Sequence, residues 1–274
     1  MANRFIAMIT LERAVDVNPA DVTAAFDRLF PGLAGRLTRA GDGDYHEDHG
    51  GGIYLLDEVA LPVMVINQPI PAGTMDRAIA ATRIWDNAQA MSHHQGHVII
   101  SSFGDAETFQ DAVKSARAVT LLSAAIMEAT PSIGVYWTAG QTVTKADMFI
   151  PDAQHLAQEG KAPDAHWIQY YWLGGPPQDG RPTLGVITEG LEPFIGRELE
   201  FEPIPLTPPE LAQRIIGTVI YLLANGPVIN DGDTLGVSHA ECIRAVYRDR
   251  GQRPDIPVIS MRLEQIDTGG PSSA

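Results

Sequence analysis

The amino-acid sequence predicts an α+β protein with antiparallel sheets. Short apolar segments of strand length alternate with longer segments in which apolar residues recur at helical spacing. In the first part of the chain their order is strand, helix, strand, strand, helix, strand, which is the βαββαβ order of the ferredoxin-like fold. A similar order follows residue 131. We therefore expect two tandem ferredoxin-like halves joined by a long helix.

The predicted N-terminal ferredoxin-like half covers residues 1–104. Its first helix has clear boundaries, because Asn18 is a good N-cap, Pro19 fits the first helical position and Pro31-Gly32 ends the apolar pattern. The other expected elements are a buried strand at 4–11, a hairpin of strands at 53–56 and 61–66, a second helix at 73–90 and a strand at 97–103.

The long helix is predicted within a connecting segment at 105–130, where an apolar stripe ends at Pro131. The C-terminal ferredoxin-like half is expected at 131–240, followed by a C-terminal extension and tail at 241–274. The halves share no visible sequence identity, so a single α+β sheet with decorations stays open as an alternative. The elements expected in the second half are helices at 146–159 and 208–224 and strands at 132–138, 167–173, 183–188, 198–201 and 234–237.

The composition excludes several classes of partner. The chain has 274 residues, of which 45% are hydrophobic, so a packed core is expected. With 34 acidic and 19 basic side chains the net charge is −15 at pH 7. Such a field repels phosphate backbones and anionic lipids, so we expect no nucleic-acid partner and no membrane. The charge favours a basic protein partner.

The expected location is the cytoplasm of a bacterial cell. Cys242 is the only cysteine, so no intramolecular disulfide can form. The apolar run at residues 5–9 is too short for the apolar core of a signal peptide. The apolar stretch at residues 215–224 is far below the length of roughly 20 residues that a membrane span needs.

Three histidines close together are the candidate metal ligands. His93 and His97 are four residues apart, which on a helix would place both imidazoles on one face, and His94 could add a third nitrogen. However, Gly96 fits the position just after a helix end, and a strand is expected from Val98. Histidines at a helix C-terminus also interact favourably with the helix dipole, so the pattern favours a structural role over a metal site.

Aromatic and histidine side chains give the candidate ligand-binding residues, which are Trp85, His94, Trp137 and Tyr171. The segments at 136–137 and 167–172 place large rings on both faces of two predicted strands. Such rings could line a pocket between the two halves. The alternative, which the area buried by each ring favours, is that they fill the interface between the two halves as part of the core.

Other patterns identify no catalytic residue and no cofactor. The sequence has no nucleophile elbow, no dinucleotide-binding glycine motif, no phosphate-binding loop and no Cys-x-x-Cys. Glu198, Glu200 and Glu202 alternate with Leu199 and Phe201. This spacing predicts a strand whose acidic outer face is solvated, rather than an acid and base pair.

Several short phrases occur in a characteristic order along the chain. They are VMVINQPIP at 63–71, HQGHVII at 94–100, GVYW at 134–137, TLG at 183–185, GRELE at 196–200 and DGDTLG at 231–236. Together they resemble the bacterial family catalogued as domain of unknown function 4261. The resemblance spans about residues 5–240, and it implies no activity, cofactor or site residue.

From these observations we expect an acidic, non-enzymatic protein that acts by binding a partner, as an immunity protein or an adaptor does. The alternative is a metal- or ligand-dependent enzyme, or a small-molecule sensor. That alternative would use a pocket between the two halves near His93, His94 and His97.

Overall fold

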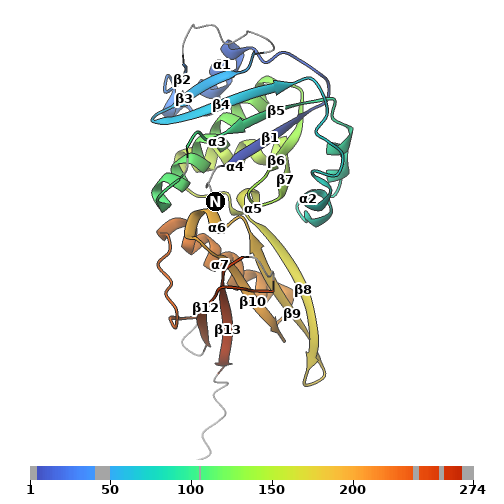
Figure 1. The fold of residues 1–274 in the computed structure, drawn as a ribbon, viewed down its shortest axis with the longest axis vertical. Coiled ribbons are helices and arrows are strands. Elements are labelled where there is room, and N and C mark those ends of the chain that lie inside the picture. Colours follow the sequence, from blue (N-terminus) through green and yellow to red (C-terminus); the bar gives the residue numbers. More distant parts are fainter. Residues whose placement is uncertain (1–4, 41–49, 105, 237–240, 253–255, 267–274) are drawn as a thin grey trace, which may run out of the picture. The chain divides into compact units, whose positions relative to one another are not determined.

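The computed structural model describes residues 5–40, 50–104, 106–236, 241–252 and 256–266. The chain divides into two compact units, Met1–Gln169 and Tyr170–Ala274, and the strands form two sheets (Figure 1). The predicted α+β class is thereby confirmed. The predicted segments, 1–104, 105–130, 131–240 and 241–274, do not coincide with these units.

The first unit contains a sheet with the strand order β2-β3-β4-β5-β1-β6-β7, in which every neighbouring pair is antiparallel. Because β5 and β6 both lie beside β1, they run parallel to each other. The strands are β1 (Ile6–Leu11), β2 (Leu37–Arg39), β3 (Gly52–Leu56), β4 (Val59–Ile66), β5 (Gly96–Ser101), β6 (Ser132–Trp137) and β7 (Thr142–Lys145).

Helices α1 (Pro19–Leu29) and α4 (Ala146–Glu159) both pack against α3 (Phe109–Ala129), and α3 also contacts β1, β4, β5 and β6. As predicted, Asn18 caps α1, because its side chain accepts a hydrogen bond from the N–H of Ala20 at 2.9 Å. Helix α3 begins with a capping box between Thr108 and Asp111. It joins β5 to β6, so the helix predicted to connect two halves is a crossover inside the first unit.

The predicted helix at 73–90 is wrong. It is replaced by the short helix α2 (Asp76–Ala81) and the 3₁₀-helix η3 (Ala88–His93), because Thr82 turns extended, with φ −59° and ψ 142°. This segment packs over β6 and β7, where its buried side chains form a cluster with Tyr136 and Val143. Two shorter helices, η1 (Pro31–Leu33) and α5 (Asp164–Trp167), complete the first unit.

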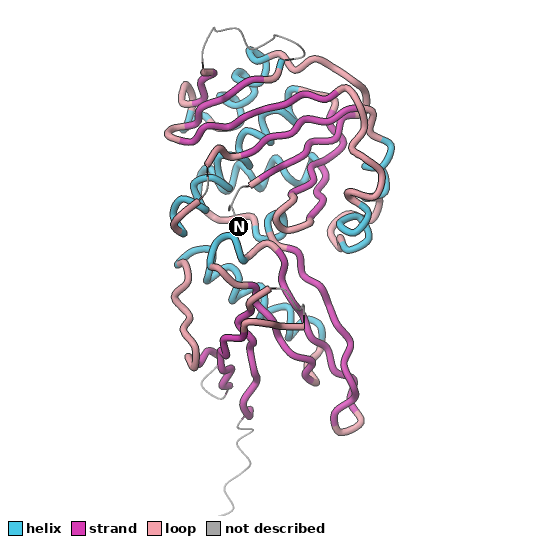
Figure 2. The backbone as a smooth tube through the Cα atoms, in the orientation of Figure 1, coloured by secondary structure: helices cyan, strands magenta, loops and turns pink. Residues whose placement is uncertain are grey.

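The second unit contains a sheet with the order β11-β12-β13-β10-β9-β8. Strands β8 and β9 form a long hairpin (Figure 2), and its turn has positive φ at Asp179 and Gly180. Helix α7 contacts β9 and β10. The elements are β8 (Gln169–Gln178), β9 (Arg181–Glu189), α6 (Glu192–Ile195), β10 (Glu198–Ile204), α7 (Pro208–Asn225), β11 (Thr234–Leu235), β12 (Glu241–Arg248) and β13 (Val258–Ile266).

Two tandem ferredoxin-like halves are not confirmed. In a ferredoxin-like sheet, another strand lies between the two strands that a crossover helix joins. In the second unit, β10 and β13 are instead adjacent and parallel. The elements at 132–159 that were assigned to the second half belong to the sheet and helices of the first unit. Among the described helices, none has the length and apolarity of a membrane-spanning segment.

Candidate ligand-binding site

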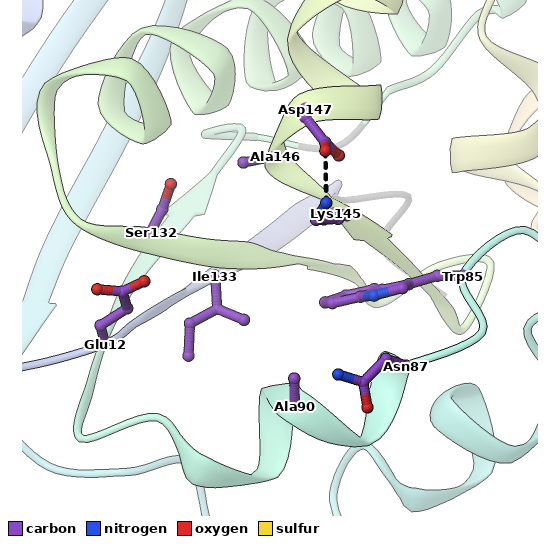
Figure 3. A pocket seen from close by; sticks show the side chains of 9 residues that line it. All are labelled: Glu12, Trp85, Asn87, Ala90, Ser132, Ile133, Lys145, Ala146 and Asp147. Atoms are coloured by element: carbon purple, nitrogen blue, oxygen red, sulfur yellow. Dashed lines mark hydrogen bonds and ion pairs between the residues drawn. The ribbon is translucent and has the colours of Figure 1, made fainter.

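A pocket of about 280 Å³ in the first unit is the candidate site (Figure 3). Four chain segments meet there, because β6 pairs with both β1 and β7 in the sheet. They are the end of β1, the loop that leads into η3, the start of β6 and the junction of β7 with α4. The lining residues are Glu12, Trp85, Asn87, Ala90, Ser132, Ile133, Lys145, Ala146 and Asp147.

Trp85 is held at the pocket by packing and by a close approach to strand β6. Together with Ile133, its partly buried ring packs against the cluster that includes Met91 and Tyr136. A Cβ atom on Gly134 would lie only 3.0 Å from Cζ3 of Trp85. Only glycine therefore lets the indole lie this close to the strand.

The charged side chains that line the pocket include more carboxylates than cations. Lys145 Nζ and Asp147 Oδ2 form an ion pair at 2.5 Å, drawn as the dashed line in Figure 3. The backbone N–H of Glu12 donates to the carbonyl of Pro131 at 2.9 Å, which ties the chain here to the segment before β6. Among the described residues, no cation pairs with the Glu12 carboxylate. The pocket thus carries one unbalanced negative charge.

The three histidines predicted as metal ligands do not form a metal centre. His94 is buried, its Nε2 accepts the N–H of Ile70 at 2.6 Å, and its Nδ1 lies 2.6 Å from the carbonyl of Met91. The first contact requires an unprotonated Nε2, so Nδ1 carries the proton and donates it. Burial lowers the pKa of His94. Both ring nitrogens are therefore already in use.

The other two histidines are placed differently. His97 is buried, with Nδ1 2.8 Å from the carbonyl of Gln68, and its ring centroid lies 6.4 Å from that of His94 in an edge contact. His93 is exposed at the end of η3. Throughout the described part of the chain, no group of three His, Cys, Asp or Glu side chains is placed to hold a metal ion.

Of the predicted ligand-binding residues, Trp85 lines a pocket and Trp137 lies in the core. Trp137 is 1% exposed, stacks on Trp167 with ring centroids 6.1 Å apart and lies 5.8 Å from the ring of Phe5. Trp137 and Trp167 thus fill the core of the first unit, and no interface between two halves is involved in these contacts. Tyr171 lies half-buried on β8 in the second unit.

A chain of three polar side chains was not found from the sequence. His166 Nε2 lies 2.8 Å from Asp152 Oδ2, and His166 Nδ1 lies 3.1 Å from Thr144 Oγ1. The hydrogen bond to His166 lowers the pKa of Asp152. The order resembles a hydroxyl, imidazole and carboxylate triad, but Thr144 is 1% exposed and cannot meet a substrate. This chain therefore ties β7 and α5 to α4.

The prediction that the acidic face of strand β10 is solvated is wrong, because Glu198 and Glu200 are buried. Glu198 Oε1 accepts the N–H groups of Gly190, Leu191 and Glu192 at 2.8, 3.1 and 3.0 Å. Its Oε2 accepts the hydroxyl of Thr188 at 2.6 Å. Glu198 thus holds the turn before α6. No signal in the sequence could have distinguished it from a surface glutamate.

Comparison with known proteins finds a family similar to part of the second unit. The family described as Domain of unknown function (DUF4261) matches residues 187–262, which run from β9 into β13. Over these residues the chain is similar to that family, and the match lies in the part that follows Val186. No match was found among the curated proteins or among the solved structures.

Proposed function

We propose that this chain is a non-enzymatic partner-binding protein of the immunity-like or adaptor kind, which acts in the bacterial cytoplasm on a basic protein partner. The observation that carries the proposal is the net charge of −15. Opposite charge accelerates encounter and discourages wrong partners, and the same field keeps nucleic acids and anionic membranes away.

The test uses the full chain as bait in an extract of its native host, at low and then at high salt. We expect a basic protein that is retained at low salt and released at high salt. The captured protein is then purified, and its association rate with the full chain is measured against ionic strength. A rate that does not fall with salt, or the lack of any salt-sensitive partner, would contradict the proposal.

A second candidate function is that of a small-molecule sensor, and the pocket beside Trp85 favours it. An aromatic side chain and a few polar groups around a small concavity are typical of ligand sites. A ligand that binds only the folded chain raises its unfolding temperature. We expect a metabolite library to yield such a ligand, with the shift lost in Trp85→Phe and kept in Trp172→Phe, a half-buried tryptophan on β8. Equal shifts in both variants would contradict this candidate.

For the finer fold, we propose that the first unit has a ferredoxin-like core extended by β2, β3 and β7. The support is the strand order β4-β5-β1-β6, in which α1 lies between β1 and β4 in the chain and α3 joins β5 to β6. An experimental structure of the chain tests this. If its four central strands did not superpose on a ferredoxin-like sheet, the proposal would be wrong.

A further inference from the structure

We infer that the pocket beside Trp85 takes a small organic amine with an apolar or aromatic body. The inference rests on the second candidate function, the small-molecule sensor, and names the chemical class of its ligand.

The body of the ligand is set by the apolar part of the lining. The indole of Trp85, the side chain of Ile133 and the methyl group of Ala90 all line the pocket. Figure 3 shows Trp85 and Glu12 on opposite sides of Ile133. A ligand that reaches from one to the other therefore passes over an apolar surface. Because Trp85 and Ile133 also pack against the core cluster, this surface is held in place before binding.

The charge of the ligand is set by the one carboxylate that lacks a cation. Asp147 is neutralised by Lys145, whereas no ion pair in the described residues involves Glu12. An ammonium group at Glu12 would gain a charge-assisted hydrogen bond. The face of a tryptophan is also the aromatic surface that attracts cations most strongly. An anionic ligand would instead be repelled by Glu12 and would have to displace Asp147 from Lys145.

The size of the ligand follows from the volume of the pocket. About 280 Å³ lies just below the usual range of roughly 300–1,000 Å³ for ligand sites. The pocket therefore suits one ring or a short aliphatic chain together with its amine.

The test compares three probes of similar shape that differ in charge: 2-phenylethylamine, 2-phenylethanol and 3-phenylpropanoate. Affinities for the full chain are measured by calorimetry at low salt. We expect the amine to bind about tenfold more tightly than the alcohol, because only the amine adds the attraction of opposite charges to its hydrogen bond with Glu12. The carboxylate should bind most weakly.

The variant Glu12→Gln should remove the preference for the amine over the alcohol. A matched control is Glu107→Gln, which removes the same charge from an exposed residue that does not line the pocket. The control should keep the preference, because a general loss of net charge affects both variants equally. Trp85→Phe should weaken the binding of all three probes.

Two results overturn the inference. One is a failure of charge selectivity: the alcohol or the carboxylate binds as tightly as the amine, or Glu12→Gln keeps the preference for the amine. In that case the ligand class is wrong while the pocket still binds small molecules. The other is that no probe binds. The thermal-shift screen with Trp85→Phe then decides separately whether the sensor itself is wrong.

Discussion

Replacing Glu198 by alanine should destabilise the second unit strongly. The carboxylate is buried and accepts three backbone N–H groups of the turn that leads into α6, together with the hydroxyl of Thr188. Alanine leaves the three N–H groups without their acceptor. Thr188 keeps a partner, because its hydroxyl oxygen also accepts the N–H of Leu199 at 2.8 Å.

The size of the effect follows from the groups left unpaired. Each buried donor that loses its acceptor costs about 1–3 kcal/mol, so three of them cost at least about 3 kcal/mol. Part of this is offset, because burial raises the pKa of Glu198 and removing the carboxylate removes the cost of burying its charge. We therefore expect the lower end, about 3 kcal/mol, which corresponds to a fall of about 1–3 M in the urea midpoint.

Urea unfolding followed by circular dichroism measures the midpoint, and hydrogen exchange of residues 187–199 reports the turn itself. Glu198→Gln keeps the size but places an amide donor among the N–H groups, so we expect about half the loss. Glu192→Ala removes a carboxylate from the same turn and should cost under about 1 kcal/mol. If the free energy of unfolding of Glu198→Ala lay within about 1 kcal/mol of that of the parent, the assigned role of the carboxylate would be refuted.

Three further predictions concern the first unit. Burial lowers the pKa of His94 below its ordinary value of about 6.5, so the unfolded chain binds the proton more readily and stability falls as the pH falls below that value. His94→Gln should therefore show a shallower loss of stability between about pH 7 and pH 5 in urea titrations, and equal slopes would contradict this. Thr120→Val removes the acceptor of Trp167 Nε1–H, 2.9 Å away in the core, and should cost about 1–3 kcal/mol, whereas Thr120→Ser should cost much less; chemical denaturation distinguishes the two. Gly134→Ala would place a Cβ 2.6 Å from a main-chain oxygen of the facing strand and 3.0 Å from Trp85, so it should cost about 1–3 kcal/mol or more and change the near-ultraviolet circular dichroism of the indole; an unchanged spectrum would contradict the close approach.

Helices with strong local signals could be predicted from the sequence. The expected helices at 18–30, 105–130 and 208–224 correspond to α1, α3 and α7, since their caps and apolar stripes are contained within each segment. The helix expected at 73–90 was wrong because Trp85 packs against β6, a strand about 50 residues later in the chain. The predicted assignment of strands to sheets was also wrong, because strand pairing depends on partners that are distant in the sequence.

Burial of charged residues could not be predicted either. Glu200 alternates with apolar neighbours as a solvated residue would, yet it is buried, and its Oε2 accepts the N–H of Gln252 at 2.7 Å. The N–H group that binds it thus comes from a loop 52 positions away. Burial raises the pKa of Glu200, which is the reverse of what a solvated outer face implies.

The candidate pocket shows why its residues could be found only in part. Trp85 can be selected from the sequence as a large aromatic residue. Glu12 and Lys145 are distinguished from other charged residues only by their positions in the assembled sheet. Strand β6 pairs with β1 on one side and with β7 on the other, and Gly134 lies opposite both Thr10 and Lys145 in the register. The same pairing therefore places Trp85 on β6, brings Lys145 beside it and leads Glu12 to the other end of the pocket. A shift of one residue in either pair would move Gly134 to the opposite face of its neighbours and would separate the aromatic wall from the charged groups, so the binding site depends on this register as much as on its side chains.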